Sequence, residues 1–163
     1  MAVRNCQELG ENFQLIVKRL ESNQNLLKLL YYTGKDPLSE ADITSNIIKN
    51  EIHNELIRFV PKLPPQEGAQ SRVGLRIDRG IPDSANTEFR IITFSVEIFV
   101  PITQWLIKGT NLRPFAIMGE IEKTLKGKRV NGLGKIDFDG FALDFISNEM
   151  TDYVMTFTIE VYD

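Results

Sequence analysis

Apolar residues recur every three or four positions through the first third of the chain, which is the spacing of an amphipathic helix. The first such stretch comprises Leu9, Phe13, Ile16, Val17 and Leu20. A leucine-rich segment follows, and either Asn23 or Asn25 is its expected N-cap. A third helix is predicted behind a weak capping signal at Ser39, reaching about residue 53. Residues 1–60 are therefore predicted to be mainly helical.

Alternation of apolar and polar residues, which is typical of strands, dominates the second half of the chain. The clearest apolar face comprises Ile92, Phe94, Val96, Ile98 and Val100. A shorter strand is predicted over Val73–Ile77, followed by a turn-rich loop over Asp78–Thr87. The last segment, Tyr153–Tyr162, alternates in the same way. Each strand is expected to bury one face and to leave the other for solvent or a neighbour.

A further helix and a hairpin are predicted between these strands. Asn111 is the expected N-cap of the helix, and Gly127 is the expected residue just past its end. Two short strands, Ile136–Phe138 and Phe141–Phe145, are predicted to form the hairpin around Asp139-Gly140. The reason is that Asp-Gly between apolar alternations favours a two-residue turn.

The order of these elements predicts an α+β fold, because the strands cluster instead of alternating with helices. We expect a mostly antiparallel sheet packed against helices, with a helical N-terminal third. The length of 163 residues fits a single domain over 1–163, with the sheet and helix core in 71–163. By composition, Pro61–Gln70 is predicted to be a linker or loop.

The net charge argues against nucleic acid as a partner, and the lack of long apolar runs argues against a membrane. The formal net charge is −3 at pH 7, whereas a dedicated nucleic-acid binder usually carries a basic excess. No apolar run in the sequence approaches the roughly 20 residues that a membrane span needs. We therefore expect a soluble chain that does not bind a membrane.

The reactive side chains are too few to suggest an enzyme. His53 is the single histidine and Cys6 the single cysteine, so internal disulfides and the common zinc patterns are excluded. His53 lies in a polar helical stretch and is predicted to be solvated instead of catalytic. Cys6, near the start of the first helix, is predicted to be an inert, half-buried thiol.

Three other polar features have simple structural explanations. Three aspartates surround the predicted hairpin: Asp137, Asp139 and Asp144. They lack the loop spacing of a calcium motif. The pair Gly132 and Gly134 follows a helix and precedes a strand, the reverse of a phosphate loop, so it predicts a turn. The basic run Lys123–Arg129 suits the C-terminal end of a helix dipole. No metal or cofactor is expected.

The connection around Trp105 is the most informative segment for partners. Either Trp105 packs back on the core, or it anchors in a neighbouring subunit, since Trp is favoured at the centres of interfaces; the sequence leaves both open. The candidate residues for contact with a subunit or partner are Trp105, Ile107, Arg76, Arg79 and Phe99.

The segment Phe89–Asp163 orders a long strand, a helix, a hairpin and a terminal strand. In this order it resembles the tail terminator (tail completion) proteins of tailed bacteriophages, and related neck proteins of the head–tail junction share much of the plan. The resemblance implies a non-catalytic α+β subunit without cofactors. Such subunits form a ring, commonly a hexamer, that caps the tail tube and then docks onto the head connector.

The implied partners are other copies of the chain, the tail tube protein and the connector or neck proteins of the head. The implied location is the virion tail or neck, assembled in the host cytoplasm. DNA would pass through the ring without specific binding, and an acidic balance suits such a channel. Two readings remain beside the terminator: a head-completion, neck-adaptor or tube-initiating protein, and a cellular ligand-binding or adaptor module. A small enzyme would need a polar cluster that the sequence does not contain.

Overall fold

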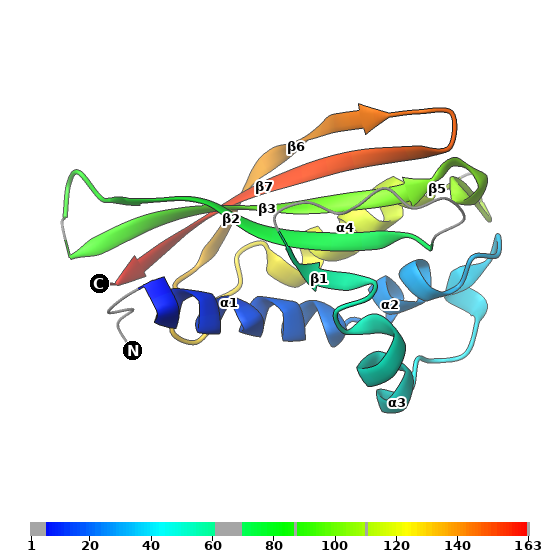
Figure 1. The fold of residues 1–163 in the computed structure, drawn as a ribbon, viewed down its shortest axis with the longest axis horizontal. Helices are drawn as coiled ribbons and strands as arrows, with labels where there is room; N and C mark the ends of the chain where they lie inside the picture. Colours follow the sequence, from blue (N-terminus) through cyan, green and yellow to red (C-terminus); the bar gives the residue numbers. More distant parts are fainter. Residues whose placement is uncertain (1–5, 61–69, 87, 110, 163) are drawn as a thin grey trace.

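The computed structural model describes residues 6–60, 70–86, 88–109 and 111–162, and it has the predicted α+β fold (Figure 1). The helices are α1 (Cys6–Glu21), α2 (Gln24–Tyr31), α3 (Ser45–Ile47) and α4 (Arg113–Leu125). The main sheet comprises β1 (Ile57–Phe59), β2 (Arg72–Pro82), β3 (Phe89–Pro101), β6 (Ile136–Ile146) and β7 (Met150–Tyr162).

The sheet is mostly antiparallel, as predicted, with the strand order β1-β2-β3-β7-β6. Strand β3 pairs antiparallel with β2 and β7, β7 pairs antiparallel with β6, and the short β1 adds parallel to β2. Figure 1 shows β6 along the rim of the sheet, on the side away from α1. Within the described residues, no helix is both long and apolar enough to cross a membrane.

The helical stripe of α1 and the apolar face of β3 meet in the core. All five predicted stripe residues of α1 are buried. The ring of Phe13 lies edge-on to that of Phe94, with centroids 5.2 Å apart, and Phe94 stacks on Phe157 of β7 at 5.2 Å. The second half of β3 is buried on both faces, so that Ser95 and Glu97 are covered as well. The prediction of a half-buried strand therefore holds only for the first half of β3.

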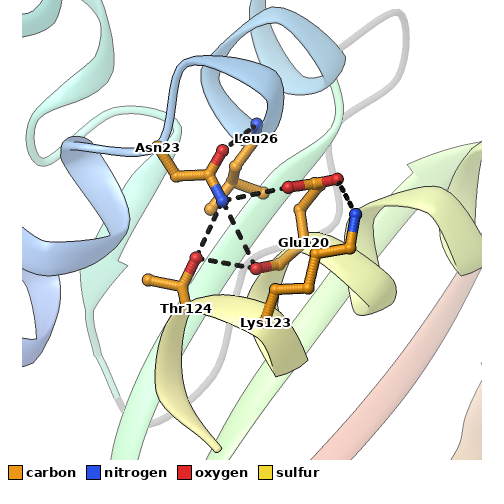
Figure 2. Close-up of polar contacts among 5 residues, drawn as sticks. All are labelled: Asn23, Leu26, Glu120, Lys123 and Thr124. Carbon is orange, nitrogen blue, oxygen red and sulfur yellow. Dashed lines mark hydrogen bonds and ion pairs between the residues drawn. The ribbon is translucent and has the colours of Figure 1, made fainter. Parts of the chain in front are cut away.

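Asn23 caps α2, as one of the two predicted alternatives, and it also joins α2 to α4 (Figure 2). Its side-chain oxygen accepts a hydrogen bond from the backbone N–H of Leu26 at 3.0 Å. Its amide nitrogen donates to the Thr124 hydroxyl at 2.8 Å and to the Glu120 carboxylate at 3.1 Å. Burial raises the pKa of Glu120, but hydrogen bonds from Lys123 and Asn23 outweigh it, so the pKa lies below its ordinary value.

The third predicted helix begins later than its expected cap. Ser39 lies in a separate 3₁₀ turn, η1 (Pro37–Ser39), and its hydroxyl donates to the Asp36 carbonyl at 2.9 Å. The cap is Thr44, whose side chain accepts from the N–H of Ile47. Helix α3 then continues as a π-helical turn, η2 (Ile48–Ile52). The Ser39 signal failed because its hydroxyl is used within its own turn.

The loop predicted over Asp78–Thr87 is in large part strand. Strand β2 continues to Pro82, which pairs with Arg90 of β3, and the register shifts at a bulge between Ile77 and Arg79. Thr87 lies outside the described residues, as does most of the predicted linker, residues 61–69. The turn-forming composition was overridden because β3 is long enough to supply a backbone partner along this whole arm.

The hairpin predicted at Asp139-Gly140 is wrong. Strand β6 runs unbroken through this dipeptide, which forms a bulge against β7, and Gly140 takes a φ of 133°. The turn between β6 and β7 lies instead at residues 147–149, where the Ser147 N–H donates to the Met150 carbonyl at 2.9 Å. A bulge and a tight turn both favour Gly with positive φ, so the same dipeptide suits either.

The N-cap predicted for α4 is also displaced. Asn111 and Leu112 form β5 (Asn111–Leu112), which pairs with β4 (Leu106–Ile107) in a small second sheet. This pairing places Leu112 in the N-cap position of α4. Gly127 does follow the end of α4, with a φ of 72°, as predicted.

Candidate assembly surface

The outer edge of β6 is the main open feature of the sheet. At its start the edge is covered, because the backbone of Ile136 bonds Lys128 and Gly127 at 2.9 and 2.7 Å. From Phe138 to Ile146, no other strand of the described chain pairs on the outer side. We call this segment, Phe138–Ile146, the β6 edge.

The β6 edge is apolar and exposed on both faces. Its exposed side chains are Phe141 (53%), Leu143 (49%), Phe145 (48%) and Ile146 (64%). Single exposed apolar residues are common on monomers, but a contiguous group of large ones usually marks a contact surface. The open backbone of an edge strand is also a template on which another strand can pair.

Helix α4 extends this surface on the helix-covered face of the sheet. Phe141 and Leu143 pair with Met155 and Tyr153 of β7, so they share that face. Phe115 of α4, which is 43% exposed, lies with its ring 6.0 Å from that of Phe141 and 5.5 Å from that of Tyr153. The aromatic rings thus form one patch from α4 to the rim of the sheet.

The opposite face of the sheet carries a cluster of charges. Arg72, Glu97 and Asp152 are at most 2% exposed, and the exposed Asp144 of β6 joins them. The carboxylate oxygens of the three acids lie within 4.8 Å of one another, a spacing that would also suit a metal ion. Burial is the main cause that lowers the pKa of Arg72, Arg58 lowers it further, and Glu97 opposes both. Its guanidinium provides a counter-charge for Glu97.

The three aspartates considered for calcium do not come together. Asp144 lies beside Glu97 and Asp152. Asp139 instead accepts a hydrogen bond from the Thr158 hydroxyl at 2.5 Å, and Asp137 lies 3.5 Å from the Lys135 ammonium. The three aspartates therefore do not form one site.

The five residues predicted to contact a partner divide into inner and outer groups. Ile107 and Phe99 are 7% and 3% exposed, so both side chains pack within the subunit. Trp105 packs partly against the core, and its indole N–H donates to the Thr151 hydroxyl at 2.8 Å. Arg76 and Arg79 lie at the surface on β2, where Arg76 pairs with Asp78 at 2.7 Å.

Arg113, which sequence reasoning missed, holds the Trp105 segment in place. Its side chain is fully buried and donates to the carbonyls of Gln104, Leu29, Tyr32 and Gly34 at 2.8, 2.6, 2.8 and 2.6 Å. Its backbone N–H donates to the Trp105 carbonyl at 2.7 Å. Burial lowers the pKa of Arg113 to about 10, so the group stays charged at neutral pH.

The histidine and the cysteine differ from their predicted environments. His53 is not simply solvated, because its ring nitrogen lies 2.5 Å from the Glu21 carboxylate and ties α1 to the turn before β1. Cys6 is exposed, not half-buried. Neither observation makes a catalytic arrangement.

Two clefts flank the loop after α4. The first, about 550 Å³, is lined by α1 and by the predicted basic run, with Lys18, Arg19, Lys123 and Lys128 among its residues. The second, about 620 Å³, includes the Gly132–Gly134 turn. A Cβ on Gly134 would lie 2.0 Å from the Glu160 carbonyl oxygen, so the glycine serves a close backbone approach. The prediction of a turn here is confirmed.

The β6 edge was missed because Phe141–Phe145 was predicted to be one arm of a hairpin. In the sequence, Phe141, Leu143 and Phe145 share one phase of the alternation, which is the pattern of a strand with a single apolar face. Phe145 lies on the opposite face only because the register shifts between Leu143 and Phe145. The second apolar face therefore depends on a bulge that the local pattern does not indicate.

Comparison with known proteins adds a family and a distant structural likeness. The family model described as YomW matches residues 23–159. The chain is similar to a chain in a structure described as the virion of a native gene transfer agent particle, with 13% sequence identity and a TM-score of 0.49. That alignment covers 91% of this chain and 98% of the other. No curated protein matches the chain.

Proposed function

This chain belongs to the YomW family, and we propose that it is a structural protein of a tailed-phage virion, the tail terminator. In this role, copies of the subunit form a ring that caps the tail tube, stops its growth and joins it to the head or neck. The single observation that carries the proposal is the apolar, open β6 edge with Phe115 beside it.

Association is the state that this surface favours. Covering a large apolar side chain that is half exposed gains about 1 kcal/mol, so covering the four on β6 and Phe115 gains about 5 kcal/mol before association costs. A ring needs two different surfaces on each subunit that fit each other. Durable contacts of this kind bury on the order of 2,000 Å² or more.

The element plan supports a subunit of the tail end or head–tail junction, the class to which the terminator belongs. The long β3, the helix α4 and the β6–β7 hairpin follow one another in the order that resembles terminator and neck subunits. The net charge of −3 suits a ring through which DNA passes without specific binding. The ring would then act by shape and contact: it occupies the end of the tube and presents a new surface to the head.

Deletion of the gene in its phage tests this role directly. Loss of a terminator should give tails of abnormal length, which electron microscopy of the particles would measure. Tails of normal length that fail to join heads would contradict the terminator and indicate a neck adaptor. Absence of tails would indicate a tube-initiating protein.

A second experiment tests the partners. Purified protein added to its own tail tubes should appear as a ring at one tube end in negative stain. A stable monomer that ignores tubes and other copies would contradict any assembly role and favour a cellular adaptor module.

A further inference from the structure

We propose that the cleft between α1 and the loop after α4 binds the phosphate groups of a DNA backbone, without regard to base sequence. This cleft of about 550 Å³, which we call the basic cleft, is lined by Lys18, Arg19, Lys123 and Lys128 among others. The inference goes beyond the proposed function, because it assigns a ligand to a surface that shares no residue with the β6 edge. The choice of DNA as the source of phosphate rests on the proposed function, in which DNA passes each subunit.

The basic cleft gathers cations from two helices and a loop. Lys18 and Arg19 lie in the last turn of α1, Lys123 lies in the last turn of α4, and Lys128 lies in the loop that follows. Neither aspartate nor glutamate is among the described residues that line the cleft. The net charge of −3 is an average over the chain, and this part of the surface is positively charged.

The ends of the two helices account for only part of this charge. A helix C-terminus carries roughly half a negative charge, so α1 and α4 together supply about one. Lys123 pairs with the Glu120 carboxylate at 2.7 Å, as Figure 2 shows. Lys18, Arg19 and Lys128 form no ion pair with any described residue. An excess of about two positive charges therefore remains in the cleft, and it favours an anion.

Hydrogen bonds hold the cationic loop against α1. The Arg19 guanidinium donates to the Arg129 carbonyl at 3.3 Å. The Lys128 N–H donates to the Leu125 carbonyl at 3.0 Å, and the Lys128 carbonyl accepts from the Ile136 N–H at 2.9 Å. The backbone that carries these cations is thus in place before a ligand binds, so less free energy is lost in ordering it.

A nucleic-acid backbone fits the remaining donors of the cleft. The hydroxyls of Ser22 and Thr124 already donate to carbonyls of their own helices, at 2.6 and 2.7 Å. The cationic side chains and the Asn131 amide are left to face a ligand. Lysine, arginine and asparagine are among the residues that contact DNA phosphates, and such contacts carry no sequence information. An acidic protein segment would need carboxylates at matching positions, whereas every nucleotide supplies a phosphate.

Contacts of this kind are weak, which suits a ligand that has to move. Phosphate contacts supply the sequence-independent affinity of DNA-binding proteins and let DNA slide. The net negative charge of the subunit opposes binding elsewhere on its surface. Copies in a ring would each provide one basic cleft, so that several weak contacts would hold the DNA without fixing its position.

The salt dependence of DNA binding tests the proposal. The measurement is the fluorescence anisotropy of a labelled, random-sequence duplex titrated with the full chain. The logarithm of the binding constant falls with the logarithm of salt concentration by about 0.9 per phosphate contact, so three unpaired cations predict a slope of about −3. Between about 50 and 200 mM salt the affinity should fall roughly fortyfold. An unmodified chain that fails to bind the duplex at the lower salt overturns the proposal.

A double variant removes two cations that form no ion pair within the described residues. Lys18→Gln with Lys128→Gln should weaken binding at low salt by at least about tenfold and reduce the slope to about −1. The matched control, Lys35→Gln with Lys49→Gln, changes the net charge equally at exposed positions outside the cleft and should change affinity less than about twofold. Equal losses in the two pairs would indicate attraction by net charge alone and overturn the cleft as the site. Circular dichroism checks that each variant is folded.

Adding a cation gives an effect that misfolding cannot produce. Asn131 is an exposed residue of the cleft, so Asn131→Lys should tighten binding and steepen the slope by about 1. Thr33→Lys, at an exposed position outside the cleft, adds the same charge and should leave the slope unchanged. If the two variants behave alike, the basic cleft is not where DNA binds.

Competitors identify the source of the anion. Poly-glutamate at the same charge concentration should displace the duplex poorly, because an extended peptide carries one charge per about 3.4 Å and a duplex one per about 1.7 Å. Inorganic phosphate should act only through ionic strength, since a single phosphate makes few of the contacts. Displacement by poly-glutamate as strong as by DNA would indicate an acidic protein partner. Displacement by phosphate beyond that by chloride at equal ionic strength would indicate a site for the free anion. Either result overturns the assignment to DNA.

These results can be separated from the proposed function. Abnormal tail lengths on gene deletion, with a chain that does not bind duplex DNA, would keep the terminator role and remove the phosphate site. Normal tails on deletion, with DNA binding that depends on Lys18 and Lys128, would keep the phosphate site and remove the terminator role.

Discussion

Replacing Arg113 by Met should destabilise the subunit by about 3–4 kcal/mol, because a buried set of carbonyls would lose its donor. Methionine keeps much of the length of the side chain but donates no hydrogen bond. The Leu29 and Gln104 carbonyls accept in fully buried positions, whereas the bonds to Tyr32 and Gly34 are only partly buried. We expect water to replace the latter two.

The magnitude follows from that division. Each buried acceptor left without a partner costs about 1–3 kcal/mol, so Leu29 and Gln104 together cost about 2–6 kcal/mol. Part of this is recovered because the variant no longer buries a charge, a cost that also lowers the pKa of Arg113 to about 10. A net loss of about 3–4 kcal/mol would remove a large share of the roughly 5–15 kcal/mol that stabilises a typical domain.

Urea unfolding followed by circular dichroism measures this loss. The midpoint should fall while the slope of free energy against urea stays constant, since the surface exposed on unfolding changes little. Arg79→Met, at an exposed position on β2, is the matched control and should change stability by less than about 0.5 kcal/mol. A loss below about 1 kcal/mol for Arg113→Met would refute the reasoning that its bonds hold this region.

Three further changes test the surface and the supports of the fold. Leu143→Lys should weaken association in light scattering while leaving the melting temperature within about 2 °C, since the site is half exposed. The control Leu38→Lys, at another exposed apolar position, should change neither association nor melting temperature. Asn23→Ala should cost about 2 kcal/mol in urea unfolding, about half from the cap and half from the bonds to α4; no loss would mean that water replaces both. Gly134→Ala should cost about 2–4 kcal/mol because its Cβ would meet a carbonyl oxygen at 2.0 Å, whereas Gly119→Ala, with open space around it, should cost nothing; equal effects would contradict the close approach.

Local periodicity correctly predicted the elements that do not depend on a distant partner segment. The helical stripe of α1 is buried at every predicted position, because apolar residues at 3.6-residue spacing lie on one side of a helix and that side packs against the core. The alternation in β3 and in Tyr153–Tyr162 was sufficient in the same way. The α+β class followed from the order of these elements alone.

The errors lie where a distant segment decides between two local choices. Asp139-Gly140 suits a turn or a bulge, and the length of β7 selects the bulge. Asp78 suits a loop or a bulged strand, and β3 selects the strand. The position of Trp105 depends on Thr151, 46 residues away, so no pattern near it indicated how far it packs into the subunit.

The features that led to the wrong hairpin also restrict which strands can pair with β6. An exposed, flat, apolar edge pairs with any other edge, and natural sheets prevent this with bulges and inward or edge charges. Strand β6 carries two register shifts, one near Asp139 and one near Asp144. Each bulge twists the strand and each supplies a carboxylate, so a partner must match both a bent backbone and an acidic face. In the proposed assembly, the apolar residues would provide the free energy of association, and the bulges with their carboxylates would restrict which partner can pair. An edge built in this way limits non-specific pairing, whereas the closure of a head-to-tail assembly into a ring depends on the rotation between neighbouring subunits.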